Sequence, residues 1–136
     1  MSRARNITIR PVRRQDAQTW LCLRTALWPD GANEHAEEIA AFFAGRVIEP
    51  DAVLLAECDG ACVALMELSL GRQLADLPGQ KIAYVEGLYV APEVRTAGVA
   101  LRLLRAAQEW GRAHQCTAFA SDRAGRVIVD RRYRLN

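Results

Sequence analysis

Two hydrophobic periods alternate along this chain. Five segments have the alternation or the short apolar run of a β-strand: Ile7–Val12, Ala52–Cys58, Ala61–Leu70, Lys81–Val90 and Thr117–Ser121. Asp59-Gly60 joins the second and third of these segments, and this dipeptide favours the tight turn of an antiparallel hairpin. The pattern therefore predicts a sheet that contains a β-hairpin.

Three other segments carry apolar residues at helical spacing. They are Arg14–Leu27, which Pro29 stops, Glu34–Ala44, for which Gly45 is a suitable C-cap, and Gly98–His114. The first two have apolar sets at Ala17, Trp20, Leu21, Leu23 and Leu27, and at Ala36, Ile39, Ala40 and Phe43. The third has the clearest stripe, which consists of Val99, Leu103, Ala106, Ala107 and Trp110.

The composition is that of a globular chain, and 136 residues are enough for one domain spanning residues 1–136. No run of eighteen apolar residues is present, and the basic residues at the start precede a strand pattern instead of a signal-peptide core, so we expect a cytoplasmic protein without membrane association. Cys22, Cys58, Cys62 and Cys116 form no C-x-x-C pair and have no histidine at zinc spacing. We expect buried reduced thiols and no metal site.

The net charge is only +2, and arginines gather near both ends of the chain. Neither a recognition helix nor interleaved aromatic residues accompany them, so a nucleic-acid partner is not expected. A solvated surface, or help in binding the phosphates of a coenzyme, accounts better for these arginines.

The junction between the strand that ends at Val90 and the helix that follows is suited to bind a phosphate. It reads V-A-P-E-V-R-T-A-G-V-A, with Pro92 in a turn and Gly98 opening the helix. Unpaired N–H groups at the start of a helix and the positive end of its dipole attract an anion, and Arg95 adds a positive charge. The alternative is an ordinary solvated helix start.

This loop resembles the acetyl-coenzyme A loop of the GNAT acyltransferases, whose pattern is Arg/Gln-x-x-Gly-x-Gly/Ala. The matching residues are Arg95, Thr96, Ala97, Gly98, Val99 and Ala100. The resemblance implies an α/β (α+β) fold with a central mixed sheet flanked by helices, and acetyl-coenzyme A as co-substrate. It also implies that the strand bends away from a parallel neighbour, which leaves backbone groups of Leu88, Tyr89 and Val90 free to pair with the pantetheine arm.

Glu86 interrupts the apolar strand and is followed by Gly87, which indicates a bulge or a bend. At the mouth of such a cleft a carboxylate can bind an ammonium group and accept its proton, directly or through water. We therefore interpret Glu86 as the candidate catalytic base. The alternative is a solvent-facing strand residue.

Four separated segments resemble one branch of the GNAT proteins, the aminoglycoside 6′-N-acetyltransferases. They contain Arg24-Thr25-Ala26-Leu27-Trp28-Pro29, the strand and loop described above, Gln108-Glu109-Trp110-Gly111, and Ala120-Ser121-Asp122. The resemblance implies that Trp28 packs against a sugar ring, that Glu86 contacts the reacting amine, and that Asp122 binds a second ammonium group. Asp76 and the acidic helix with Glu34, Glu37 and Glu38 are further candidates. The ordinary alternatives are a core aromatic residue for Trp28, a turn residue for Asp122 and a solvated helix face for the three glutamates.

The resemblance breaks after Asp122, where the branch continues with a loop, a helix and two strands. Here Arg126–Arg134 looks like the last strand joined almost directly to Asp122, as if a helix were missing. Such a loss would expose apolar surface, so we expect a homodimer, with exchange of the tail strand as one arrangement. Two alternatives stay open: another acceptor, such as a polyamine, an amino sugar or a protein N-terminus, and a non-catalytic module that binds coenzyme or a partner.

Overall fold

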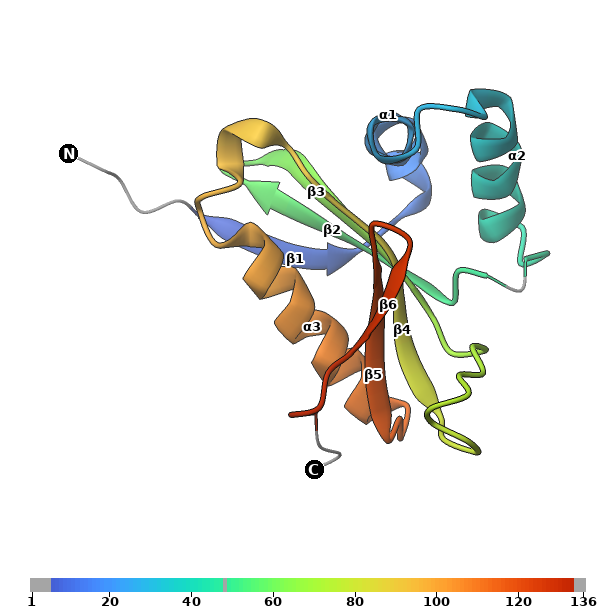
Figure 1. Cartoon of the computed structure of the whole chain (residues 1–136). Coiled ribbons are helices and arrows are strands. Elements are labelled where there is room, and N and C mark those ends of the chain that lie inside the picture. The colour runs from blue at the N-terminus through green and yellow to red at the C-terminus, as the bar shows by residue number, and fades with distance from the viewer. Residues whose placement is uncertain (1–5, 48, 134–136) are drawn as a thin grey trace.

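A computed structural model of the chain describes residues 6–47 and 49–133. A sheet with the order β1-β2-β3-β4-β5-β6 forms its centre (Figure 1). The strands are β1 (Ile7–Pro11), β2 (Ala52–Cys58), β3 (Ala61–Ser69), β4 (Ile82–Val90), β5 (Ala118–Arg123) and β6 (Arg126–Val129). The helices are α1 (Ala17–Leu27), α2 (Ala32–Phe43) and α3 (Val99–Ala113), with short 3-10 turns at Arg14–Asp16 and Pro92–Val94.

Every neighbouring pair of strands is antiparallel except β4 and β5, which are parallel, so the sheet is mixed as expected. The predicted hairpin joins β2 to β3, and its turn residues Asp59 and Gly60 have φ values of 53° and 88°. Positive φ at both turn residues matches the twist of the flanking strands. The parallel pair requires a crossover, and α3 supplies it.

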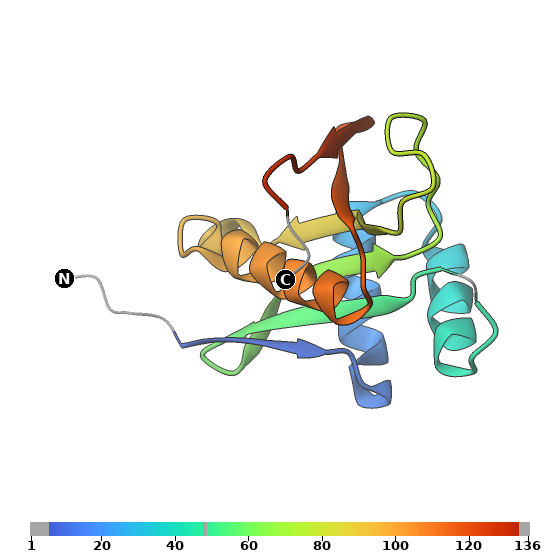
Figure 2. The ribbon, with the colours of Figure 1, turned by 90° about the horizontal axis from the view of Figure 1, so that it is seen from below.

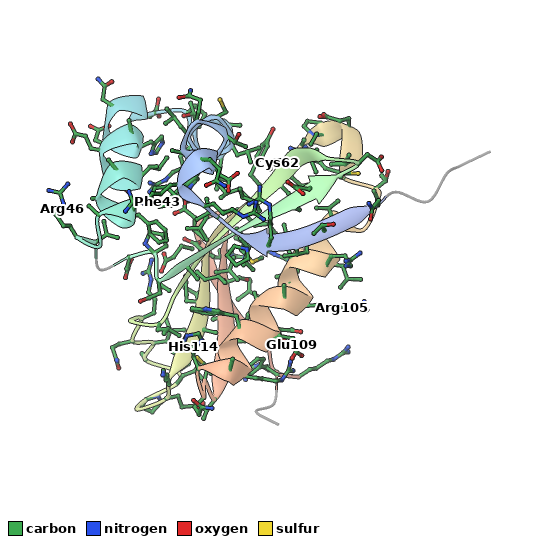
Figure 3. All side chains as sticks on the ribbon, turned by 180° about the vertical axis from the view of Figure 1, so that it is seen from behind. Phe43, Arg46, Cys62, Arg105, Glu109 and His114 are labelled. Atoms are coloured by element: carbon green, nitrogen blue, oxygen red, sulfur yellow. The ribbon has the colours of Figure 1, made fainter. Side chains whose placement is uncertain are left out.

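The sheet is covered on both faces (Figure 2). Leu54 and Ala56 pack in one cluster with Leu103 of α3, whereas Val53 and Leu55 pack in another with Trp20 of α1 and Ile39 of α2. This alternation is the period of two that a strand imposes. Two fully formed apolar layers therefore hold the sheet from opposite sides. Figure 3 shows the molecule from behind, with Phe43 at the end of α2, where its ring lies 5.8 Å from that of Trp20.

The stripe predicted for α3 is confirmed, because Val99, Leu103 and Ala107 are fully buried. The face predicted for α2 is only partly correct. Ile39 is buried, but Ala36 and Ala40 are exposed and His35 is buried in their place. The reason is a polar contact that an apolar pattern does not reveal: His35 Nε2 lies 2.8 Å from the backbone oxygen of Trp28, which ties the start of α2 to the end of α1.

The expectation of buried thiols holds for Cys58 and Cys116, while Cys62 is half-buried and Cys22 is exposed, so for Cys22 the expectation was wrong. Cys22 lies on the outward side of α1 because Trp20 and Arg24 occupy its inward side. None of the helices in the described ranges is long and apolar enough to cross a membrane.

The segment after α3 folds back onto the sheet as far as residue 133. β6 pairs with β5 of the same chain, and no helix follows α3 within residues 114–133. A turn after β6 then brings Tyr133 into the core, where its ring stacks on Phe119 at 5.6 Å. The strand expected over Arg126–Arg134 is thus wrong for residues 130–133, because β6 ends at Val129 and Tyr133 is a buried aromatic anchor; Arg134 lies outside the described residues.

Candidate functional site

The parallel strands β4 and β5 separate partway along their length. They pair only from Ile82–Val85 to the facing residues 118–121, and Asp122 and Arg123 then pair with β6. β4 continues to Val90 with β3 as its partner (Figure 1). Its other edge, from Glu86 onward, faces the opening between the strands. Backbone groups at such an opening need a ligand or water as partners, because leaving them unpaired is costly.

A β-bulge in β4 sets the direction of Glu86. Gly87 is opposite Glu67 and Val85 is opposite Leu68, so Glu86 is an extra residue without a partner on β3. A bulge of this kind re-aims a side chain, which is the bend that Glu86-Gly87 predicted. Gly87 also allows a close approach, because a Cβ at this position would lie 2.6 Å from Cη2 of Trp28.

The opening between β4 and β5 beyond Val85 is called the fork below. A cavity of about 380 Å³ lies in it. One wall is the β4 edge, the opposite wall is the turn from β5 to β6, and the end of α1 closes the third side. Its lining includes Trp28, Glu86, Leu88, Ser121 and Asp122. The three residues predicted to contact an acceptor, Trp28, Glu86 and Asp122, therefore meet in one cavity although they lie far apart in the sequence.

Glu86 is held by two neighbours. Ser69 Oγ and Arg72 Nε both donate to its Oε2, the latter at 2.9 Å, and Arg72 Nη2 donates to Oε1 at 2.7 Å. Burial acts to raise the pKa of Glu86, but these hydrogen bonds and the charge of Arg72 outweigh it and hold that pKa below its ordinary value. Glu86 is therefore an ionised carboxylate at neutral pH.

A second cavity of about 270 Å³ shares Trp28, Glu86 and Asp122 with the first, and most of its lining is acidic. The full lining is Arg24, Trp28, Glu38, Glu49, Pro50, Glu67, Glu86 and Asp122. Within that lining Arg24 forms ion pairs with Glu38 and Glu67, and its guanidinium lies 5.5 Å from the Trp28 ring centre. Five carboxylates line this cavity together with one guanidinium, and Arg72 pairs with Glu86 from outside the lining. The carboxylates still outnumber these two cations, so the cavity favours a ligand with several positive charges.

Glu67 is the most deeply placed of these carboxylates, at 2% exposure. Burial raises its pKa, which the charge of Arg24 and the 2.9 Å hydrogen bond from Trp20 Nε1 offset only in part. It interrupts the apolar strand β3 as Glu86 interrupts β4, so the same pattern could have identified it. Arg72, Ser69 and Glu49 were also missed, and nothing in their local sequence distinguishes them.

A third cavity, of about 490 Å³, lies between the far end of β4, the end of α1 and the start of α3. Leu88, Tyr89, Val90, Arg95 and Ala100 are in its lining. Arg95 Nε donates to the backbone oxygen of Val90 at 2.9 Å, which places its positive charge beside the strand end.

Gly98 is the N-cap of α3, with φ at 81°, and apart from its two chain neighbours no atom of the described residues lies within 4 Å of the position that a Cβ would occupy. The backbone at the start of α3 is therefore open to a ligand, as the phosphate-site prediction requires. Thr96 is exposed and Ala97 is half-buried in the preceding turn. The side chain of Val99 is buried against the sheet, so this residue can offer a ligand only its backbone.

Three of the acidic candidates do not reach the site. Asp76 is exposed and lines none of these three cavities, since its loop packs on Ile82 and Tyr84 through Leu74 and Leu77. Among the three acidic candidates of α2, Glu38 lines one of these three cavities, while Glu34 and Glu37 are on the exposed face and line none of them. For Glu34 and Glu37 the ordinary role of a solvated helix face fits the structure, and Asp76 is an exposed loop residue.

Comparison with known proteins agrees with this geometry. The model of the "Acetyltransferase (GNAT) family" matches residues 17–134. The aminoglycoside N(6′)-acetyltransferase type 1 of Klebsiella aerogenes is 43% identical over 116 residues, which cover 84% of this chain and 76% of that protein. The protein of the same name from Serratia marcescens is 37% identical over 105 residues, which cover 76% of this chain and 70% of that protein.

Solved structures show the same likeness. The apo structure of an aminoglycoside 6′-N-acetyltransferase from Acinetobacter haemolyticus superposes with a TM-score of 0.76 at 33% identity, over 86% of this chain and 79% of that one. An aminoglycoside N-acetyltransferase in complex with CoA superposes with a TM-score of 0.77 at 25% identity, over 91% of this chain and 81% of that one.

Proposed function

Because this chain belongs to the acetyltransferase (GNAT) family, we propose that it transfers the acetyl group of acetyl-coenzyme A to the 6′-amino group of an aminoglycoside. It is an acetyl-coenzyme A-dependent N-acetyltransferase. The acceptor, the position of the amine and the roles of individual residues are the proposed part. The observation that carries the proposal is the acidic cavity beside the fork.

The fork and the start of α3 fit the co-substrate. The edge of β4 that faces away from β3 at Leu88–Val90 offers backbone groups to an extended amide-containing arm, apart from the Val90 oxygen, which accepts from Arg95 Nε. The open N-terminus of α3 with Arg95 offers N–H groups and charge to a diphosphate. The coenzyme would supply the acetyl group as an activated thioester. We assign the binding of its arm to Leu88, Tyr89 and Val90, and the binding of its diphosphate to the loop from Arg95 to Ala100.

The acidic cavity fits a polycationic acceptor. Each charge-assisted hydrogen bond between a carboxylate and an ammonium group contributes about 1.5–3 kcal/mol, so a ligand that reaches several carboxylates gains affinity at each one. Asp122 of β5 and Glu38 of α2 both line this cavity, so they offer carboxylates from two different elements. Trp28, at the boundary of both cavities, offers an aromatic surface to a sugar ring.

Glu86 prepares the amine for attack. An alkyl amine with a pKa near that of lysine, about 10.4, needs roughly 4–5 kcal/mol to reach its neutral form at pH 7. The ionised Glu86 binds the ammonium group and takes its proton, directly or through a water molecule. The amine nitrogen then forms a bond with the acetyl carbon, and the coenzyme leaves as the thiolate.

The proposal is tested by binding and turnover with defined ligands. Calorimetry with acetyl-coenzyme A and with kanamycin should show that both bind, and mixing all three components should release free thiol. Mass spectrometry of the product should then locate the acetyl group on the 6′ nitrogen.

Other outcomes would contradict specific parts of the proposal. Thiol release with spermidine, glucosamine or a peptide N-terminus but not with kanamycin would refute the aminoglycoside acceptor. Binding of both ligands without thiol release would refute catalysis and favour a binding module.

We also propose that the protein is a homodimer that pairs through the β6 edge. β6 is the last strand in the sheet order, and Val127 and Ile128 are 49% and 44% exposed. An exposed apolar edge strand is a favourable surface for a second copy. Light scattering should give twice the 15.1 kDa of one chain, and Val127→Lys should reduce that mass by half. A wild-type mass of one chain would contradict the proposal.

A further inference from the structure

Arg72 has no part in the site predicted from the sequence, yet it donates two of the three hydrogen bonds that Glu86 accepts from the described residues. It lies in the loop after β3, which Figure 2 shows on the same side of the molecule as the β5–β6 hairpin. Its guanidinium is bidentate on the Glu86 carboxylate and lies 4.7 Å from the Tyr84 ring centre. Stacking and a bidentate pair together define one orientation for the guanidinium.

The hydrogen bonds to Glu86 leave one acceptor site of its carboxylate without a donor from the described residues. An ionised carboxylate has about four lone-pair sites, two on each oxygen. Ser69 and Arg72 Nε occupy both sites of Oε2, and Arg72 Nη2 occupies one site of Oε1. Among the residues that the structure describes, no other group donates to Glu86, so one site of Oε1 is left for a ligand.

We infer that Arg72, together with Ser69, is a positioning residue that clamps Glu86 so that the remaining lone pair of Oε1 meets the acceptor amine or the water that carries its proton. This inference rests on the proposed function, because it assigns a supporting residue to the proposed base. The clamp fixes the orientation of Glu86 before the acceptor arrives. The side chain of Glu86 is 14% exposed, whereas that of Arg72 is 42% exposed, so Arg72 contacts Glu86 from the side that faces solvent.

The clamp also keeps Glu86 ionised in an acidic environment. The charged and titratable groups around Glu86 come from several elements: Arg24 of α1, Glu38 of α2, Glu49 before β2, Glu67 of β3, Asp122 of β5, Arg72 of the loop after β3, and Tyr84 of β4. The carboxylates in this set favour protonation of one another. Arg72 opposes that effect at Glu86, because its hydrogen bonds and charge lower the pKa of Glu86.

The test compares Arg72→Met with Arg72→Lys. Methionine keeps much of the side-chain length without hydrogen-bond donors, and lysine keeps the charge but not the bidentate geometry of the guanidinium. In a thiol-release assay with kanamycin, Arg72→Met should lower kcat by about 10- to 100-fold, the scale expected when a reacting group is misplaced. The acid limb of its kcat/KM profile should move to higher pH, because the pKa of Glu86 rises once the guanidinium is gone. Arg72→Lys should restore part of kcat and move the acid limb back toward the wild-type position.

Two results would overturn the inference. A lower KM with unchanged kcat would mean that Arg72 only competes with the amine for Glu86. A loss of activity with an unchanged pH profile, in parallel with a lower melting temperature, would mean that Arg72 only anchors its loop.

A separate measurement keeps this inference distinct from the proposed function. Carbon-13 NMR titration of the Glu86 carboxyl group, without any ligand, should show a higher pKa in Arg72→Met than in the wild type. An unchanged pKa would refute the clamp whatever the acceptor is. Failure of the wild-type protein to acetylate kanamycin would refute the acceptor while the titration still decides the clamp.

Discussion

Glu86→Gln is expected to lower kcat/KM for aminoglycoside acetylation by about 10²- to 10⁴-fold, the range that a general base contributes. The amide has nearly the shape of the carboxylate and keeps an oxygen for Ser69, but it neither carries charge nor accepts a proton at neutral pH. The affinity for acetyl-coenzyme A should be unchanged, because the cavity at the start of α3 does not include Glu86. A thiol-release assay measures kcat/KM, and calorimetry measures the affinity for acetyl-coenzyme A.

Glu109→Gln is the matched control. Glu109 is exposed on α3 (Figure 3) and pairs only locally with Arg112 at 2.9 Å. The same chemical change there should leave kcat/KM within about twofold of the wild type, since surface ion pairs contribute little. Activity of Glu86→Gln within threefold of the wild type would remove Glu86 from the mechanism.

The pH dependence has a defined sign. A carboxylate is charged above its pKa, and the pKa of Glu86 lies below the ordinary value of 4.5 because of Arg72 and Ser69. The wild-type acid limb that Glu86 contributes should therefore fall below pH 4.5, and it should be absent in Glu86→Gln. A wild-type acid limb centred near pH 6.5 would instead point to a histidine as the base.

Tyr133→Ala is expected to cause the largest loss of stability, about 3–5 kcal/mol, as for other large aromatic residues removed from a core. Tyr133 is 4% exposed, stacks on Phe119, and lies under the Arg112 guanidinium at 5.1 Å from the ring centre. Its hydroxyl lies so near Gly111 that a Cβ there would be 2.7 Å from it. Urea denaturation followed by tryptophan fluorescence gives the free energy of unfolding.

Tyr133→Phe separates the ring from the hydroxyl. The hydroxyl lies 3.5 Å from the backbone oxygen of Gln108, a long contact, so its loss should cost no more than about 0.5–1.5 kcal/mol. If Tyr133→Ala unfolds at the same urea concentration as the wild type, the tail is not anchored on α3 and β5 in solution.

Local signals predicted the parts of the fold that depend on neighbouring residues. Asp59 and Gly60 are residue types that adopt the positive φ values that their turn requires, so the two residues alone indicate it. The α3 stripe follows from helical spacing alone. Glu86 and Gly98 could be identified because each interrupts a regular pattern at a point where the chain changes direction. The family resemblance then linked these points to one cleft.

The missed features depend on contacts between distant residues. Arg72 reaches Glu86 across 14 positions and Trp20 reaches Glu67 across 47. Arg24, a polar residue in an apolar helix pattern, is buried because two carboxylates from other elements meet it. Such pairs become visible only once the topology brings the strands and helices together.

The extra residue at the β4 bulge has a consequence for the evolution of this strand. Ala83 and Val85 belong to the same core cluster as Val90, although strict alternation would turn odd and even positions to opposite sides. The inserted residue is accommodated by the bulge, because Val85 and Gly87 on either side of it pair with the consecutive residues Leu68 and Glu67 of β3. A lineage that deleted this single codon would lose the carboxylate but keep the orientation of the segment from Gly87 to Val90, so the charge is separable from the strand that carries it.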